Sequence, residues 1–508
     1  MPEGQGNKNK LLLPLSLFLI TAITRVPYTS KLLYHTDSVH FALALERYDI
    51  TLHQPHPPGY FFYVMLGRLL NLLIADANTV FVTISVLFSG LAVVAIYYLG
   101  KEVYDSRIGF VGAAIAITSP NFWFHGEVAL SYILEAFFST VVAFFCWKIY
   151  KGEHKYLWLS VIALGVAGGI RQNTLFFLLP LWLFSVRGLP IRKVVLSLGL
   201  LGFVCLLWFV PMVWMTGGWS VYRDAFHELW MFNTGHNSVF ERGWPALTRY
   251  ASALFDFTVY GVGAGIFGLG LAAYSIMRQR VFGSLDREKI LFFSFWILPS
   301  VLFYLLIFIH PSNPGYVLVF LPALFILAAA SVGYIGRELR KTVKADPTTV
   351  IASTLIITNL LFFLFVKSIV SYGEIRGHYK DISAVLNSFR AFNPSDTIII
   401  SEPYVFFGFR HFMYYLPEYR VYQIDIRVAA DGMVRKTWWG MGRQTHLTDG
   451  IDMPAGVSGF AMPLIADDIS KIKGLKGISI MDLPGANMHI AYGSVSLIRD
   501  IYPKLRIN

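Results

Sequence analysis

The chain has 508 residues, of which 55% are hydrophobic, 16% aromatic and only 14% charged. Soluble domains carry about 25% charged residues, so the composition excludes a protein that folds mainly in water. The net charge of +11 does not indicate nucleic-acid binding, because the basic residues lie in short loops and form no extended stripe. Cys146 and Cys205 both fall inside apolar segments, which favours small packing residues over a disulfide.

Long apolar segments predict an all-α polytopic membrane protein. A helix needs about 20 apolar residues to cross a bilayer. We expect eleven such helices, the first a retained span because no small-residue cleavage site follows it. The predicted spans lie near 11–28, 79–99, 108–122, 131–149, 156–170, 174–186, 194–216, 254–277, 289–309, 315–335 and 349–369.

The charges of the loops predict an orientation. With the N-terminus in the cytoplasm, the cytoplasmic loops hold most of the lysines and arginines, as the positive-inside rule requires. The apolar segment 59–74 would invert this pattern if it crossed the membrane, so we interpret it as a helix at the outer surface. We expect an integral plasma (inner) membrane protein.

The last part of the chain has a different composition and predicts a small extracytoplasmic α/β domain. Strands are expected at 396–401 and 419–426 and near 456–461, 477–482 and 488–498, with a helix at 406–416. The predicted organisation is therefore a transmembrane domain at 1–370 and an α/β domain at 371–508. The first outer loop, 29–78, belongs to the transmembrane domain in this prediction and carries juxtamembrane helices.

Polar residues gather in the outer loops, and the first loop is the richest. Asp37 stands at the start of an amphipathic helix, where capping alone would explain a carboxylate and a general base is the functional alternative. His35, His40, His53 and His56 share the loop. Their His-x-x-His spacing beside prolines is not helical, so the sequence leaves the metal question open, with a divalent cation as one option.

Four further outer loops supply candidates. Glu127, followed by Tyr132 and Glu135, suits acid–base chemistry, and the alternative for Glu127 is an interfacial charge. Arg171, between two apolar blocks, suits a phosphate at headgroup depth, although an ordinary phospholipid contact would also explain it. The remaining candidates are His310 and Tyr316, whose short loop is otherwise a plain tight turn, and His236, in a longer loop that resembles a lid or binding surface.

Several of these segments resemble the GT-C class of membrane glycosyltransferases. They are HQPHPPGYFFYVMLGRLLN after Asp37, HGEVALSYILEA at 125–136, GGIRQN at 168–173 and HPSNPGY at 310–316. Within the class, the likeness is to the protein O-mannosyltransferase and aminoarabinose transferase group (glycosyltransferase family 39/83-like). The resemblance implies a GT-C fold of about eleven transmembrane helices.

The resemblance also implies an activity. A sugar would pass from a polyprenyl-phosphate carrier to a hydroxyl or amine of an acceptor lipid, glycan or protein at the outer face, with inversion. Asp37 would be the general base and Glu127 a second catalytic carboxylate, and no cofactor is certain. Donor-phosphate contacts would come from Arg171, His310 and Tyr316, and further substrate contacts from His35, His56, Tyr132, Glu135 and His236.

Two other functions compete with this one. A surface-polysaccharide polymerase or ligase would share the donor chemistry and differ in the acceptor. A lipid or solute transporter would place charges within its spans, and the predicted spans are nearly free of charge.

Overall fold

The computed structural model of the protein describes residues 5–507 apart from 236, 279–286, 341–345, 403, 405, 426–435, 442, 449, 466–467, 470–471, 473 and 504. The described chain forms two compact units. The helical unit consists of the residues up to Thr29 together with Pro57–Glu374, and the α/β unit consists of Ser30–His56 together with Ile375–Asn508.

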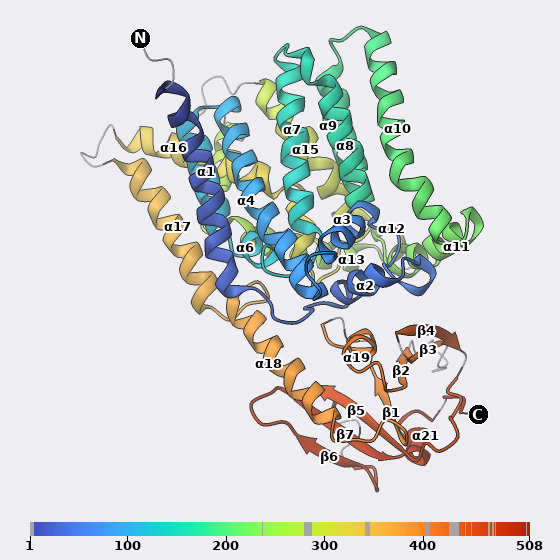
Figure 1. The fold of residues 1–508 in the computed structure, drawn as a ribbon. Coiled ribbons are helices and arrows are strands. Elements are labelled where there is room, and N and C mark those ends of the chain that lie inside the picture. The colour runs from blue at the N-terminus through green and yellow to red at the C-terminus, as the bar shows by residue number, and fades with distance from the viewer. Residues whose placement is uncertain are drawn as a thin grey trace. The chain divides into compact units, whose positions relative to one another are not determined.

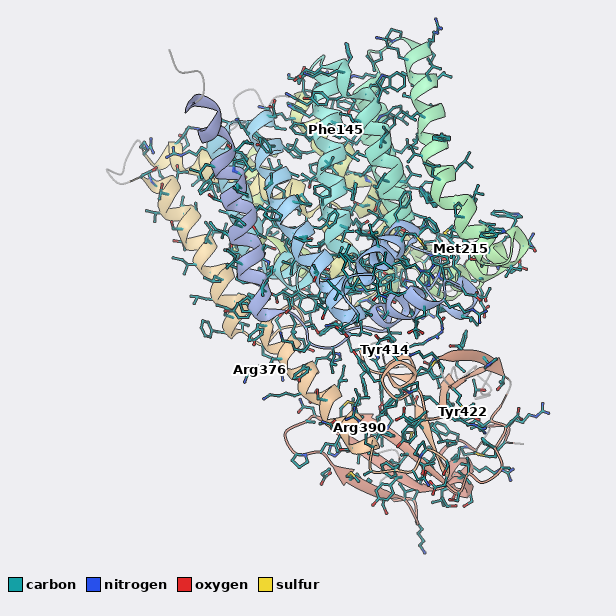
Figure 2. All side chains as sticks on the ribbon, in the orientation of Figure 1. Phe145, Met215, Arg376, Arg390, Tyr414 and Tyr422 are labelled. Atoms are coloured by element: carbon teal, nitrogen blue, oxygen red, sulfur yellow. The ribbon has the colours of Figure 1, made fainter. Side chains whose placement is uncertain are left out.

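The helical unit is a bundle in which α7 packs against α4, α8 and α9 (Figure 1). Aromatic side chains fill the contacts between helices; Phe145 of α7, for example, stacks on Tyr156 with ring centroids 5.6 Å apart (Figure 2). The helices of this unit are α1 (Gln5–Arg25), α3 (Phe61–Asn71), α4 (Ala77–Val103), α5 (Ser106–Thr118), α6 (Pro120–His125), α7 (Tyr132–Tyr150), α8 (Leu157–Ile170), α9 (Gln172–Val186), α10 (Ile191–Met215), α11 (Trp219–Trp230), α12 (Val239–Arg242), α13 (Trp244–Val262), α14 (Gly265–Arg278), α15 (Arg287–Leu306), α16 (Leu321–Leu339) and α17 (Pro347–Phe365).

Each of the eleven predicted apolar blocks is mainly helical, but the block 108–122 is divided between α5 and α6. Among the described residues, seven helices are long and apolar enough to cross a membrane, and four apolar helices are shorter. The block predicted at 254–277 is not one straight span, because it consists of α13 and α14, bent by 112°. Gly263 ends α13 with a φ of +55°, and a Cβ there would lie 1.8 Å from Asn359 Oδ1, so glycine is required at the bend.

The segment predicted as a surface helix forms α3. Tyr63 and Val64 are fully buried on one side, whereas Leu69 is 61% exposed and Leu72 and Leu73 after the helix are more exposed still. One face of α3 therefore packs on the bundle and the other is apolar and uncovered, as in a helix that lies in a membrane interface.

The α/β unit is built on one seven-stranded sheet, in the order β4-β3-β2-β1-β5-β7-β6. β1 pairs in parallel with β2 and β5, and all other pairs are antiparallel. The strands are β1 (Thr397–Ser401), β2 (Val421–Asp425), β3 (Lys436–Met441), β4 (Gln444–Thr448), β5 (Gly459–Ile465), β6 (Ser479–Asp482) and β7 (Met488–Ser494). A small C-terminal sheet region is present, as predicted, and β3 and β4 are strands that the sequence analysis did not anticipate.

Both faces of the central strand are covered. On one face, α18 (Tyr372–Phe389) and α19 (Phe409–Tyr415) pack on the sheet through a core that includes Phe389, Ile399 and Phe412. On the other face, α21 (Ile498–Ile501) contributes Ile498 to a core with Ile400 and Tyr422 (Figure 2). β1 is therefore buried along its whole length, as central parallel strands are.

The early segment Ser30–His56 packs as part of the α/β unit, although chain order suggested grouping it with the helices. It contains α2 (Thr36–Glu46) and the short η2 (Ile50–Leu52). The backbone of Leu33 donates to the Tyr415 hydroxyl at 2.9 Å, and its carbonyl lies 3.1 Å from His411 Nε2. The guanidinium of Arg410 donates to the carbonyl of Leu52 at 2.6 Å. These contacts tie both ends of the segment to α19.

Candidate functional site

The start of α2 positions Asp37. His35 is the N-cap residue, and its Nδ1 accepts a hydrogen bond of 3.0 Å from the backbone N–H of Asp37. The Ser38 hydroxyl accepts in turn from the backbone N–H of His35. Asp37 is therefore not the helix cap itself. It lies in the first helical turn, where the helix dipole favours a negative charge.

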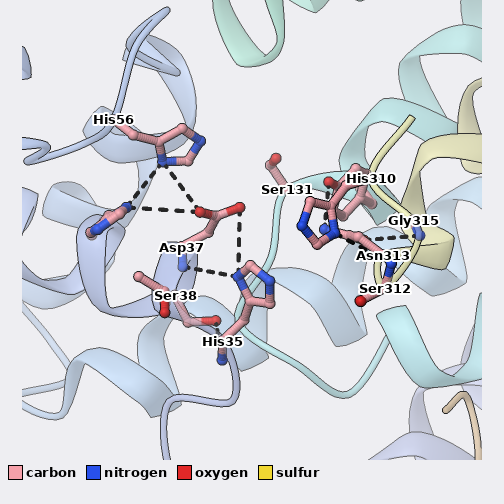
Figure 3. Close-up of polar contacts among 12 residues, drawn as sticks. His35, Asp37, Ser38, His56, Ser131, His310, Ser312, Asn313 and Gly315 are labelled. Carbon is pink, nitrogen blue, oxygen red and sulfur yellow. Dashed lines mark hydrogen bonds and ion pairs between the residues drawn. The ribbon is translucent and has the colours of Figure 1, made fainter. Parts of the chain in front are cut away.

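Three histidines surround the Asp37 carboxylate, and we call His35, Asp37, His40 and His56 the carboxylate–histidine cluster. Nδ1 of His40 and Nδ1 of His56 lie 3.8 and 3.6 Å from Asp37 Oδ1, and 3.3 Å from each other. His35 Nδ1 lies 3.6 Å from Oδ2. Figure 3 shows the rings of His35 and His56 directed at the carboxylate.

Burial keeps these imidazoles neutral. The pKa of His40 lies well below its usual range, first because the ring is buried and then because the charge of Arg410 disfavours a second cation. Burial also lowers the pKa of His53 to about 3, with Arg410 adding to the effect. The pKa of His35 is lowered by burial, against the opposing charge of Asp37. His35, His40 and His53 are thus uncharged at neutral pH.

A second layer supports the cluster. The ring of His53 packs between His40 and Trp438, with centroids 5.7 and 5.4 Å away. Arg410 is buried and donates to Thr445 Oγ1 at 2.6 Å in addition to Leu52. His53 has a φ of +54°, a conformation uncommon for residues other than glycine and enriched at functional sites.

The helical unit carries a second group of polar residues, which we call the arginine–tyrosine cluster. Arg171 separates α8 from α9 and is buried. Its guanidinium lies 4.1 Å from the ring centroid of Tyr132 and 5.4 Å from that of Tyr60. The ring of Tyr316 contacts that of Tyr132, and the ring of Tyr304 contacts that of Tyr316. Members of the cluster are Tyr60, Tyr132, Glu135, Arg171, Tyr304 and Tyr316.

A buried ion pair holds Arg171. Its Nε lies 3.0 Å from Oε2 of Glu135, and its Nη1 donates to the Ser131 hydroxyl at 3.1 Å. The Thr174 hydroxyl donates to the other oxygen of Glu135 at 2.7 Å. Glu135 therefore fixes the orientation of the guanidinium, and a guanidinium has five N–H donors, more than these two contacts use.

The loop at 310–316 supports Tyr132 from another side. Asn313 Nδ2 donates to the Tyr132 hydroxyl at 2.9 Å, and Asn313 Oδ1 accepts from the backbone of Gly315 at 3.1 Å. A Cβ at Gly315 would lie 2.4 Å from the ring of Tyr132, so the close approach needs glycine. His310 Nδ1 accepts from the backbone N–H of Ser312 at 3.3 Å, which stabilises the turn (Figure 3).

Glu127 has other partners than Arg171. Its side chain is fully buried and accepts a hydrogen bond from the indole N–H of Trp123. The guanidinium of Arg25 lies over the same indole ring, 4.3 Å from its centroid. This arrangement anchors the loop after α6 in the protein interior.

The predicted residues thus fall into distinct groups. Asp37, His35 and His56 lie together in the α/β unit, and Arg171, Glu135, Tyr132 and Tyr316 lie together in the helical unit. His236 lies outside the described residues. Sequence reasoning missed His40 as a partner of Asp37, although its position three residues later on a helix was a usable signal. It also missed Tyr60, Tyr304 and Arg410, for which no local pattern existed.

The helical bundle with its terminal α/β unit can be compared with solved structures. The chain is similar to ArnT from Cupriavidus metallidurans bound to undecaprenyl phosphate, with a TM-score of 0.58, 13% identity, and coverage of 96% of this chain and 99% of that chain. The apo state of that protein gives a TM-score of 0.54 at 14% identity, with 97% and 99% covered. An oligosaccharyltransferase from Archaeoglobus fulgidus is 13% identical over 80% of this chain and 63% of its own, with a TM-score of 0.48. The chain is a multi-pass membrane protein with the GT-C fold.

At the level of sequence, residues 47–188 match the family described as the protein O-mannosyl-transferase TMEM260 N-terminal domain. This range contains Arg171, Glu135, Tyr132 and Glu127. No curated protein sequence matches the chain.

Proposed function

We propose that the protein is a membrane glycosyltransferase that moves a sugar from a polyprenyl-phosphate carrier to an acceptor hydroxyl or amine at the outer face of the membrane. The N-terminus would lie in the cytoplasm, and the α/β unit outside. Asp37 would act as the general base, and Arg171 would bind the phosphate of the donor.

One observation carries the choice of Asp37. Of the three carboxylates considered for the reaction, Asp37 has a side chain that is 27% exposed, whereas Glu127 and Glu135 are buried against fixed partners. A general base must come within hydrogen-bond reach of the proton that it removes. The exposed part of the Asp37 side chain leaves room for an acceptor to approach it, which supports the choice of Asp37 as the base.

The reaction needs few groups. The acceptor oxygen or nitrogen attacks the anomeric carbon and forms a new bond to it, while the bond from that carbon to the phosphate oxygen breaks and its electron pair leaves with the phosphate. Asp37 accepts the proton of the acceptor. Arg171 compensates the charge of the leaving phosphate, a role suited to a guanidinium in a site with little water. Direct attack inverts the anomeric centre.

The comparisons support this proposal at two points. The ArnT structure is described as bound to undecaprenyl phosphate, a polyprenyl carrier without its sugar. The family that matches residues 47–188 is described as a protein O-mannosyl-transferase, and its range includes Arg171. The comparisons do not narrow the acceptor, which we propose to be a hydroxyl or an amine.

Sugar release from radiolabelled polyprenyl-phosphate hexoses by the purified full chain tests the proposal. We expect turnover in the wild type and a loss of about 100-fold or more in Asp37→Asn, the scale of general base catalysis. Asp49→Asn is the matched control, because Asp49 lies in the same loop, where it caps η2 and pairs with Arg47 and has no contact with Asp37 among those described. Wild-type turnover in Asp37→Asn would show that Asp37 is not the base. If the wild type neither binds any donor nor releases sugar from it, the proposed function is rejected.

A further inference from the structure

Three side chains of the α/β unit direct one ligand atom each at a common point. Asp37 Oδ1, His40 Nδ1 and His56 Nδ1 lie within 4.8 Å of one another, and no other such group of three occurs among the described residues. Asp37 and His40 lie on consecutive turns of α2, and His56 comes from the segment after η2. The cap formed by His35 and the packing of His53 hold this geometry from either side.

The size of the triangle matches a metal ion. With sides of 3.3, 3.6 and 3.8 Å, the point equidistant from the three atoms lies about 2.1 Å from each, which is the length of a zinc–nitrogen or zinc–oxygen bond. Hydrogen bonds do not explain the same geometry. The two distances to the carboxylate exceed those of N–H···O hydrogen bonds, and only the two imidazoles are close enough to share a proton.

We propose that Asp37, His40 and His56 bind a divalent transition-metal ion, with Zn²⁺ as the expected species. Two imidazole nitrogens and one carboxylate oxygen form a donor set that suits zinc.

The surroundings select among ions. Arg410 is the cation that acts on His40, and its charge weakens the binding of any metal. An ion that gains little from imidazole, such as Mg²⁺ or Ca²⁺, does not overcome this repulsion, whereas Zn²⁺ binds imidazole strongly. We therefore expect zinc to bind and magnesium not to compete.

Three protein ligands leave the fourth position of a tetrahedral ion open, as in catalytic zinc sites. The side chains of His40 and His56 are only 9% and 12% exposed, so an incoming ligand approaches beside Asp37. If the proposed glycosyl transfer holds, on which this step rests, the acceptor hydroxyl binds at that position and loses its proton more easily. The proton passes to Asp37 Oδ2, the oxygen that does not face the metal.

Zinc binding can be measured without donor or acceptor. The full-length protein is stripped with a chelator, titrated with Zn²⁺ and analysed for bound metal by mass spectrometry, in the presence of excess Mg²⁺. We expect one zinc per chain in the wild type. His40→Phe and His56→Phe should each weaken binding by more than about 100-fold, beyond the effect of losing an outer-shell partner.

The matched control is His378→Phe, at a half-buried imidazole of the same unit outside the triangle. It should keep the stoichiometry and affinity of the wild type. Substitution with Co²⁺ gives a second readout that needs no variant, because a tetrahedral site produces intense visible bands. No zinc in the wild type, equal binding in the histidine variants, or a cobalt spectrum without those bands would overturn the site.

The two proposals fail separately. Sugar transfer by protein that has lost its zinc would remove the ion from the reaction and leave the proposed function intact. One bound zinc per chain in a protein that transfers no sugar would support the metal site and reject the proposed glycosyltransferase function.

Discussion

Burial distinguishes the three carboxylates Asp37, Glu127 and Glu135, which the sequence analysis all named as candidate site residues. Asp37 is partly exposed among neutral rings, whereas Glu135 is buried against Arg171 and Thr174. Glu127 is buried against Trp123. A buried charge with fixed partners orients its neighbours and is costly to remove. We therefore assign Glu135 to positioning Arg171 within the proposed site.

Glu135→Gln should destabilise the protein by about 3–5 kcal/mol, because it leaves the Arg171 charge buried without its partner. The double variant Glu135→Gln with Arg171→Gln should lose less than the sum of the two single variants. Urea unfolding of the purified chain in detergent measures the cycle. A purely additive double variant would show that the ion pair does not couple these residues.

His411 predicts a pH dependence of the α/β unit. Burial lowers its pKa from 6.5 to about 3, so the unfolded chain binds one proton more between these pH values. The stability that depends on neutral His411 is fully present above pH 6.5 and falls as the pH falls toward 3, by up to about 1.4 kcal/mol per pH unit.

In His411→Asn we expect lower stability at pH 7 and a flatter profile, with about one proton less taken up on unfolding. Proteolysis of the unfolded fraction in urea, followed from the C-terminus at several pH values, measures both. An unchanged slope in His411→Asn would contradict the assignment.

At the scale of elements, the length of the apolar segments predicted the helices well, whereas local sequence patterns predicted only some of the strands. Every predicted apolar block is mainly helical, because a bilayer-spanning segment must satisfy its own backbone hydrogen bonds, although two of the blocks are each divided between two α-helices. The bend between α13 and α14 was not predictable, since it depends on contact between Gly263 and Asn359, nearly a hundred residues apart. β3 and β4 were missed because neither stretch, with Trp438 or His446 near its centre, shows apolar alternation.

Gly315 ties the loop before α16 to the arginine–tyrosine cluster. Gly315→Ala should move Tyr132 away from Arg171, because the new methyl group would overlap the tyrosine ring. We expect a loss of about 1–3 kcal/mol in stability and a raised KM for the lipid-linked donor. Gly199→Ala in α10 is the control, since its Cβ meets no neighbour within 4 Å. Equal donor kinetics in both variants would separate Tyr132 from donor binding.

At the scale of the whole molecule, the main unforeseen feature is the association of Ser30–His56 with the C-terminal residues. Local patterns correctly predicted a helix that starts near Asp37. They could not show that Arg410 and His411 contact the backbone of Ser30–His56. Both residues lie on α19, whose sequence is that of an ordinary buried helix. Contacts between segments so distant along the chain leave no periodic signal.

Truncation after Glu374 should therefore release the first loop. Arg47, which is 64% exposed at its side chain but lies at the end of α2, should be cut by trypsin much faster in the truncated chain than in the intact one. Cleavage at Arg187, between helices of the other unit, serves as the control and should not change. Equal rates at Arg47 would mean that Ser30–His56 keeps its structure without the C-terminal residues.

The pairing of an early segment with a late one also sets an order of events during biosynthesis. Asp37 and its histidines leave the ribosome before nearly all of the membrane helices, yet Leu33 and Leu52 find their partners on α19 only after Pro57–Glu374 has been made. At about 5–20 residues per second, the loop waits on the order of 15 to 60 s for those partners. A newly inserted chain would thus stay without an assembled carboxylate–histidine cluster until its synthesis is almost finished.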